Sequence, residues 1–497
     1  MKFSLQNILL FSAFAFFMLA VRNADVLYTL AEQSLFVPGQ GFWEETVPAI
    51  GVVGWIGCWL TQFLHIPWLG AVLLILLWVV IYYALVYSFR LKGVWTLLAL
   101  IPVAVLLVKV ISLGYHVFYL RNQAIAFTPT LYTLLVAVGL LLIRFFFLKK
   151  LRLPSVKMPK YVNIAAFVLF WTAFVVTAFH FDYSDRNYHH ELRMARSMDE
   201  CRWNDVLSEF DKHEGRPTNL MVLLKNISLL HTGRITEMFC TDNRGTQPYV
   251  RDSLAVHLSQ QAAPMIYYQL GMFNFAYRWA MENSVQYGLS VGNLKMMTRC
   301  AIWNGETELA DKYLNLLAQT LFFKDWAAEH RRWMHNAGSF QSHPEYKAIV
   351  PLLTDEPDVL DYDQAACEKF ILDYYSDLRT DRPGLEDFTL CVSLLTESES
   401  DFVEQLDLWL QHHPYEPLPI LYQEAALMMS ESVFAPPWLA ELPFDAAVTN
   451  RFQQFGSAYY ALSNRGLTPN EMASQLRSTF GNTYWWYYYF YDDFNIY

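Results

Sequence analysis

Hydrophobic residues form six long runs within the first 180 residues of the chain. The runs cover residues 5–21, 47–64, 68–88, 94–111, 131–148 and 161–180. A helix needs about 20 apolar residues to cross a bilayer, and each run is close to that length with at most one or two charges inside it. Six such runs in succession predict a membrane domain over residues 1–182 rather than a set of buried core helices.

The pattern changes after residue 182. Apolar side chains then recur at helical spacing, as at Met194, Met198 and Val206, and no alternating run of convincing length predicts a strand. Glycine and proline separate the helical segments. We therefore expect an all-α fold, in which the N-terminal multi-pass transmembrane domain is followed by a soluble helical domain over residues 183–480 and an aromatic tail over 481–497.

Several of these segments place a glycine at a turn, with a small residue five positions later in the two clearest cases. These positions are Gly233, Gly271 with Ala276, and Gly305 with Ala310. The glycines are 38 and 34 residues apart, close to the tetratricopeptide period of about 34 residues. The motifs resemble degenerate tetratricopeptide repeats over residues 186–335. The alternative is an ordinary helical bundle with coincidental glycine spacing.

Loop charges predict the orientation, because cytoplasmic loops are enriched in Lys and Arg. The loop between the fifth and sixth runs has five positive charges and no acid, and the loop with Arg90 and Lys92 falls on the same side of the membrane. The five residues are Lys149, Lys150, Arg152, Lys157 and Lys160. We expect both basic loops to be cytoplasmic, which places everything after the sixth run outside the cytoplasm.

The number of crossings stays open at five or six. Six crossings would put the N-terminus outside, whereas Lys2 and the acidic loop after the first run indicate that it lies inside. A re-entrant or interfacial second run, which contains Gly51, Gly54 and Gly57, would leave five crossings and reconcile the charges. No Ala-x-Ala-like site follows the first run before Arg22, which favours a retained anchor over a cleaved signal peptide.

Charge divides the chain at the same place. The net charge of −11 combines +7 over residues 1–182 with −18 over the remainder. An acidic soluble half argues against binding to nucleic acid, so the expected partners are membrane lipid and one or more unidentified proteins. No glycine-rich phosphate loop, nucleophile elbow or Cys/His metal spacing occurs in the sequence. We therefore predict no cofactor and no metal.

Acidic residues in the first loop carry the one enzymatic interpretation. They are Asp25, Glu44 and Glu45. Membrane glycosyltransferases with lipid-phosphate sugar donors commonly place such carboxylates in this loop, as a general base or to hold a divalent ion. An acidic pair at a helix start is also favourable electrostatics by itself. A third hypothesis is a transporter, in which Lys109 and Arg144 would be the intramembrane ionisable residues.

The remaining reactive side chains predict little chemistry. The six cysteines include no C-x-x-C pair, so buried thiols are expected for most of them, with one or two disulfides as the alternative. His189 and His190 are adjacent, so on a helix they point about 100° apart and cannot share a metal unaided. The run of eight aromatic residues at 484–491 is expected to cap the helical domain, to dock at the membrane interface or to bind a partner.

The whole arrangement resembles an uncharacterised family of multi-pass envelope proteins from the Bacteroidetes. The resemblance rests on the segments at 61–70 and 270–276 and on the aromatic ending. It spans most of the chain and implies no established activity. Together with the loop charges, it implies a bacterial inner-membrane protein whose C-terminal domain is periplasmic. The leading prediction is therefore a non-catalytic protein-binding or scaffolding module in cell-envelope processes, because helical repeats form concave binding surfaces. The alternative is the lipid-linked sugar transferase.

Overall fold

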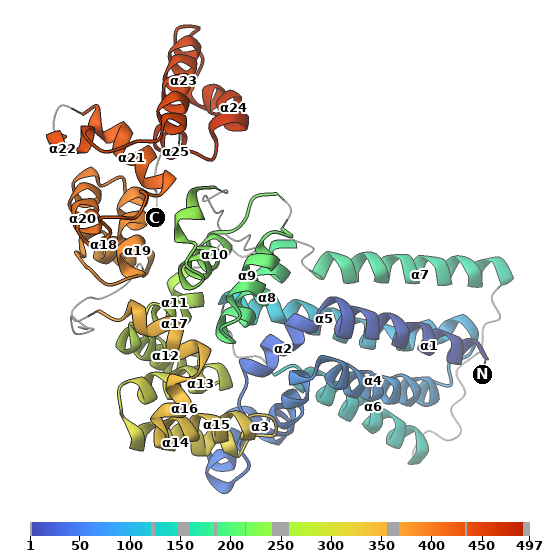
Figure 1. The fold of residues 1–497 in the computed structure, drawn as a ribbon. Coiled ribbons are helices and arrows are strands. Elements are labelled where there is room, and N and C mark those ends of the chain that lie inside the picture. Colours follow the sequence, from blue (N-terminus) through green and yellow to red (C-terminus); the bar gives the residue numbers. More distant parts are fainter. Residues whose placement is uncertain are drawn as a thin grey trace. The chain divides into compact units, whose positions relative to one another are not determined.

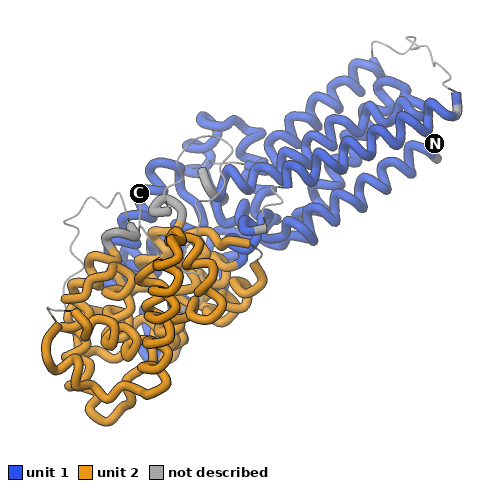
Figure 2. Tube along the Cα trace, turned by 90° about the horizontal axis from the view of Figure 1, so that it is seen from above, with its two compact units in different colours: residues 1–193, 250–256, 273–341 blue, residues 194–249, 257–272, 342–497 orange. Residues whose placement is uncertain are grey.

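The structure is a computed structural model that describes residues 2–120, 125–146, 159–182, 186–213, 215–240, 258–354, 367–432 and 435–490. Throughout these ranges the chain is helical and contains no β-strand, which confirms the predicted all-α fold. Two compact units are present (Figure 2). Unit 1 consists mainly of Met1–Arg193 and Phe273–Gln341, and unit 2 mainly of Met194–Tyr249, His257–Met272 and Ser342–Tyr497. These units follow contacts, whereas the boundary expected at residue 182 follows composition.

Five long helices of unit 1 lie side by side as a bundle (Figure 1). They are α1 (Lys2–Phe16, continued by a π-helix over Phe17–Arg22), α4 (Pro67–Phe89), α5 (Leu100–Leu120, preceded by a 3-10 turn), α6 (Thr128–Phe146) and α7 (Lys160–Phe181). Helix α4 packs against α1, α5 and α6, while α7 packs against α5. With α3 (Gln40–Thr61), these helices include all six segments long and apolar enough to cross a membrane.

The bundle core combines aromatic packing with a few satisfied polar groups. Phe11 of α1 stacks on Phe174 of α7, with ring centroids 5.6 Å apart. The fully buried Trp78 of α4 donates from Nε1 to Thr130 Oγ1 of α6 at 3.0 Å. A buried indole N–H needs such a partner because no water reaches it. These contacts fix α1, α4, α6 and α7 against one another.

Helix α3 differs from the other five apolar helices because its backbone breaks at Gly51, where φ is +74° and ψ is 170°. It does not run alongside the bundle but lies at one end of it (Figure 1). Helix α2 (Ala24–Glu32) and α3 together link the end of α1 to the start of α4. Since α1 and α4 are antiparallel, with Ser4 Oγ 3.0 Å from Tyr82 Oη, both ends of this linker belong at the same end of the bundle.

Four further helices of unit 1 follow one another as packed neighbours. They are α12 (Phe273–Tyr287), α13 (Val291–Trp303), α14 (Thr307–Ala318) and α15 (Lys324–His335), and the short α16 (Ala337–Gln341) packs on α15. A ladder of rings runs through them: Phe273 stacks on Trp303 at 4.7 Å, and Phe340 links Trp303 to Trp333. This aromatic core holds the helices as one layer.

Unit 2 contains the remaining helices. They are the end of α8 (Arg186–Asp199), α9 (Trp203–Phe210), α10 (Asn219–His231), α11 (Leu258–Gln269), α17 (Pro344–Ile349), α18 (Cys367–Asp377), α19 (Leu385–Leu395), α20 (Glu399–His412), α21 (Ile420–Ser430), α22 (Pro437–Ala440), α23 (Ala446–Ser463), α24 (Pro469–Phe480) and α25 (Tyr484–Phe490).

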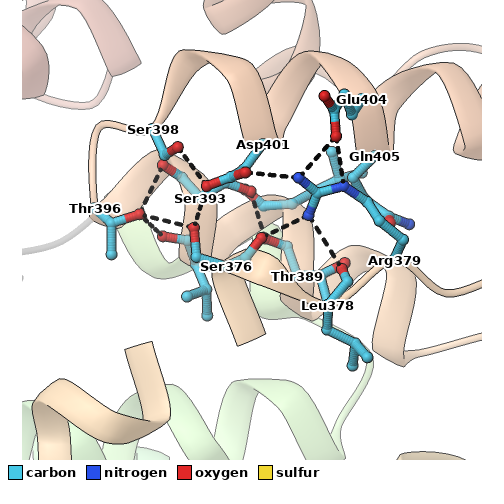
Figure 3. A network of polar contacts seen from close by, with 12 residues as sticks. Ser376, Leu378, Arg379, Thr389, Ser393, Thr396, Ser398, Asp401, Glu404 and Gln405 are labelled. Atoms are coloured by element: carbon cyan, nitrogen blue, oxygen red, sulfur yellow. Dashed lines mark hydrogen bonds and ion pairs between the residues drawn. The ribbon is translucent and has the colours of Figure 1, made fainter. Parts of the chain in front are cut away.

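A polar network ties α18 to α20 (Figure 3). Arg379, just after α18, donates from Nη2 to Asp401 Oδ1 at 2.6 Å and to Glu404 Oε2 at 3.1 Å. Burial opposes ionisation of Asp401, but hydrogen bonds from Ser398, Arg379 and Ser376 outweigh it and lower the pKa of this carboxyl. Asp401 therefore stays charged at neutral pH, and its contacts hold the end of α18 and the residues after it against the start of α20.

The aromatic run near the C-terminus forms α25 over the part that the structure describes. Tyr484, Trp485 and Tyr487 are buried. Tyr484 donates from its backbone N–H to Glu424 Oε2 of α21 at 2.8 Å, and from its hydroxyl to the Leu394 carbonyl at 3.2 Å. These side chains act as the last layer of the unit 2 core, the first of the three roles expected for them.

Candidate functional site

The acidic residues of the first loop do not meet at one site. Asp25, in the first turn of α2, accepts from His189 Nδ1 at 2.9 Å and lies 3.8 Å from Arg193 Nε. Its side chain is 12% exposed. Glu44 is exposed on α3 and accepts from Gln40 at 2.7 Å. Asp25 is therefore engaged by α8, whereas Glu45 lines a cavity.

A second ion pair fastens α2 to α13. Lys295 Nζ lies 3.5 Å from Glu32 Oε2, and both side chains are nearly buried, at 7% and 12% exposure. The same ammonium lies 5.9 Å from the ring centroids of Phe323 and Trp326. Such a cation gains from both the carboxylate and the aromatic faces. The pair joins residues 263 positions apart in the chain.

The two ends of the α2–α3 linker contact the same helical layer. Before α3, Val291 N–H donates to the Ser34 carbonyl at 3.2 Å. After α3, Leu321 N–H donates to Gln62 Oε1 at 3.0 Å, and the His65 ring stacks on Phe322 with centroids 5.3 Å apart. We call the Glu32–Lys295 pair and these three contacts the latch. The latch holds helices α13 to α15 at the end of the bundle where α3 lies.

A cavity of about 940 Å³ lies in unit 1 beside the latch. Its walls come from α3, from one face of α5 and from the residues that begin α6, and Leu289 and Leu316 complete it. The face of α5 is spaced i, i+3, i+4, i+7, as one side of a helix requires. The residues of this face are Leu106, Lys109, Val110 and Leu113.

Lys109 and Glu45 are the ionisable residues that line the cavity, and the other walls are mainly apolar. Lys109 lies inside the candidate membrane span Gly93–Phe118. In the part of the chain that the structure describes, neither Lys109 nor Glu45 has a salt-bridge partner within 4.0 Å. The cavity thus presents one cation and one anion, each available to a ligand.

The break in α3 shapes this cavity. At φ +74° only glycine is unstrained, and a Cβ at Gly51 would meet nothing within 4 Å, so the backbone angle and not crowding requires glycine here. At Gly57, by contrast, a Cβ would meet Thr128 Oγ1 at 2.5 Å. Gly57 therefore permits the close approach of α3 to the start of α6.

The other predicted positions divide between the two units. Gly271 and Gly305 have φ of +79° and +72° in the turns after α11 and α13, and Gly233 has φ of +68° after α10. Ala276 and Ala310 are fully buried. Four topology-determining residues, at 149, 150, 152 and 157, lie outside the described residues, and Lys160 begins α7.

Cysteine and histidine show no further site in the ranges covered by the structure. Cys58 and Cys391 are buried free thiols, and no group of three or more His, Cys, Asp or Glu that could hold a metal occurs in the described residues. His189 contacts Asp25 from the start of α8 rather than forming a ligand set.

Sequence reasoning missed Lys295 and the pairing of Lys109 with Glu45 around one cavity. Lys295 carried no signal, because its partner is distant in the chain. For Lys109 a signal existed: an ionisable residue inside an apolar run is costly unless it serves a purpose.

Comparison with known proteins bears on the family alone. A family model described as "Family of unknown function (DUF6057)" matches residues 1–122 and 107–491. The chain belongs to this family. No curated protein and no solved structure matches the chain. The expected membership of an uncharacterised family is confirmed. The DUF6057 match leaves the tetratricopeptide character and the Bacteroidetes source as predictions.

Proposed function

We propose that this protein is a bacterial inner-membrane protein with five crossings, whose helices after α7 lie in the periplasm. On that side, tetratricopeptide-like helices bind a protein partner as a non-catalytic scaffold in a cell-envelope process. The latch is the observation that carries this proposal. A scaffold must hold its partner at a fixed place relative to the membrane, and a layer of helices fastened to the linker between α1 and α4 is suited to this.

The topology is supported by agreement between geometry and charge. If α3 stays at the end of the bundle where it begins, α1, α4, α5, α6 and α7 are the five crossings. Lys2, the loop with Arg90 and Lys92, and the basic loop at 149–160 then all fall on one side, as the enrichment of cytoplasmic loops in Lys and Arg requires. Six crossings would place Lys2 on the opposite side from both basic loops.

A photo-crosslinking amino acid tests the scaffold directly. Val285 of α12, within the helices predicted to be repeats, is 81% exposed, and Tyr415 is 97% exposed, so the probe can replace either one without disturbing the core. Discrete protein adducts from native cells are expected at one or both positions. The control is Tyr132, exposed on the candidate membrane helix α6, where lipid and not protein is expected. If all three positions give the same adduct pattern, the scaffold proposal fails.

The transferase remains a second candidate because Glu45 lines a cavity together with a lysine. Glu45→Gln removes the carboxylate that a general base needs, while Glu44→Gln changes a neighbour outside the cavity. If the protein is a transferase, the first substitution abolishes its cellular phenotype at normal expression and the second does not. A scaffold keeps its phenotype with both substitutions.

A further inference from the structure

The cavity beside α3 has the size and lining of a ligand site. Its volume of about 940 Å³ falls within the range of roughly 300–1,000 Å³ that is typical of ligand pockets. Leu106, Val110 and Leu113 give it an apolar wall on α5, and Ala49 and Ile50 give it another on α3. Because α5 and α6 qualify as membrane spans, molecules dissolved in the bilayer are the ligands with the most direct access.

The two charges in the cavity restrict the chemistry of that ligand. A lysine within a membrane span is costly unless an anion or water accompanies it. Lys109 lies nine residues before the end of its span and has no carboxylate within 4.0 Å in the described part of the chain. Glu45, which lines the cavity from α3, likewise has no cation within 4.0 Å in the described part of the chain. A ligand that satisfies both side chains carries an anionic and a cationic group and has an apolar body.

We propose that this cavity binds one phospholipid whose headgroup contains both a phosphate and a primary ammonium, as phosphoethanolamine does. The phosphate pairs with Lys109 and the ammonium with Glu45, while the acyl chains lie along the apolar walls from α3 and α5. Lys109 then supplies affinity for any lipid phosphate, and Glu45 supplies the preference for a headgroup with an ammonium. This role does not rest on the scaffold, because a lipid can occupy the cavity whether or not the helices after α7 bind a protein.

Native mass spectrometry of the full-length, delipidated chain tests the site. The probes are mixed micelles with equal amounts of phosphatidylethanolamine and phosphatidylglycerol. The wild type is expected to retain one phosphatidylethanolamine, with about a tenfold preference over phosphatidylglycerol, equivalent to about 1.4 kcal/mol. Lys109→Met should reduce retention of both lipids about tenfold, whereas Glu45→Gln should remove the preference and keep the retention.

Matched controls separate the site from the general lipid shell. Glu44→Gln, on α3 but outside the cavity, and Lys92→Met, in the loop before α5, should both behave as wild type. Lys109→Arg keeps the cation and should keep the lipid, so it tests the site even if Lys109→Met fails to fold. Equal retention of both lipids by the wild type, wild-type retention by Lys109→Met, or a preference for a polyprenyl phosphate added to the same micelles would each overturn the proposal.

Discussion

His189 Nδ1 lies 2.9 Å from Asp25 Oδ2, so the first helix after α1 is joined to the first helix after α7. Both side chains are about nine-tenths buried. Arg22 and Asp182 form a second ion pair between the same two parts of the chain. Asp25 was one of the acidic residues considered as a catalytic base in the first loop. In this fold its carboxylate is a structural link between α2 and α8.

Asp25→Asn should lower the stability of the folded chain, because Asp25 has a structural role and not only a possible catalytic one. The substitution removes the charge that faces His189 and Arg193, and a hydrogen bond to a charged group contributes about 1.5–3 kcal/mol. We expect a loss of about 2 kcal/mol, measured as a lower midpoint of thermal unfolding in detergent. Glu44→Gln, at an exposed position, is the control and should change nothing. An unchanged midpoint for Asp25→Asn would show that the link contributes no stability.

The Glu32–Lys295 pair should show coupling in a double-mutant cycle. Lys295→Met leaves a nearly buried carboxylate without its cation, which costs about 3–5 kcal/mol in comparable buried pairs. Glu32→Gln removes that unpaired charge. The double variant should therefore lose about 1–3 kcal/mol less stability than the two single variants lose together. The exposed pair Arg278–Glu282 is the control, with an expected coupling of about 0.5 kcal/mol or less. Additive losses at Glu32 and Lys295 would contradict the latch.

The apolar runs predicted the membrane-like helices because length and composition are local properties that a single run displays. All six runs are helices over their described residues, and Gly271 and Gly305 lie in left-handed turns. The path of α3 was left open, because its apolar residues alone do not distinguish a crossing from a helix that bends back. What separates α3 from the others is a backbone angle at Gly51 and the contacts that its flanking residues Ser34, Gln62 and His65 make with residues more than 200 positions later.

The candidate site was predictable in part. Glu45 was singled out with Asp25 and Glu44 because all three are acidic and lie in the first loop, yet the fold gives them different surroundings. Lys109 was noticed as a charge in an apolar run, but nothing in the sequence places it in one cavity with Glu45. The two residues line one cavity because of how α3 is placed relative to α5 in the fold, and tertiary arrangements of this kind leave no periodic signal.

Gly51→Ala should destabilise the break in α3. A Cβ there meets no neighbour, so the cost is the left-handed backbone angle, about 1 kcal/mol or somewhat more. Gly139→Ala is the matched control: Gly139 is also a glycine of an apolar helix with open space around it, but its φ is not positive. That control should be neutral or slightly stabilising. The measurement is the thermal midpoint of each variant in the same detergent. Equal shifts in the two variants would contradict the prediction that the backbone angle at Gly51 requires glycine.

Unit 2 should lose stability as pH rises through neutrality. Burial raises the pKa of Glu424 from its ordinary value of 4.5 to about 7, although the backbone N–H of Tyr484 partly opposes the change. The folded state therefore favours the protonated acid, and the stability that this gives is complete below about pH 4.5 and is lost as pH passes 7. The expected loss is about 3 kcal/mol, since a tenfold change in proton affinity corresponds to about 1.4 kcal/mol.

Glu424→Gln separates this carboxyl from other titrating groups. The amide keeps an oxygen that can accept from Tyr484, so the contact between α21 and α25 persists without the charge. Unfolding followed between pH 5 and pH 8 should decline in the wild type and be flat over that interval in the variant. Glu431→Gln, at an exposed position one residue after α21, should retain the wild-type decline. A decline of equal size in Glu424→Gln would assign the pH dependence to another group.

The five-crossing topology predicts opposite accessibility for two engineered cysteines. In a chain whose six native cysteines are replaced by serine, Glu44→Cys should react with a membrane-impermeant maleimide once the outer membrane is opened. Lys92→Cys should react only after the inner membrane is also permeabilised. Both positions are exposed, so a difference between them reports the side of the membrane and not burial.

Because α3 begins near residue 44, protection of Glu44→Cys until the inner membrane is opened would place the start of α3 in the cytoplasm. The latch, which joins the linker around α3 to α13–α15, would then put those helices on the cytoplasmic side as well, and the periplasmic scaffold would have to be abandoned.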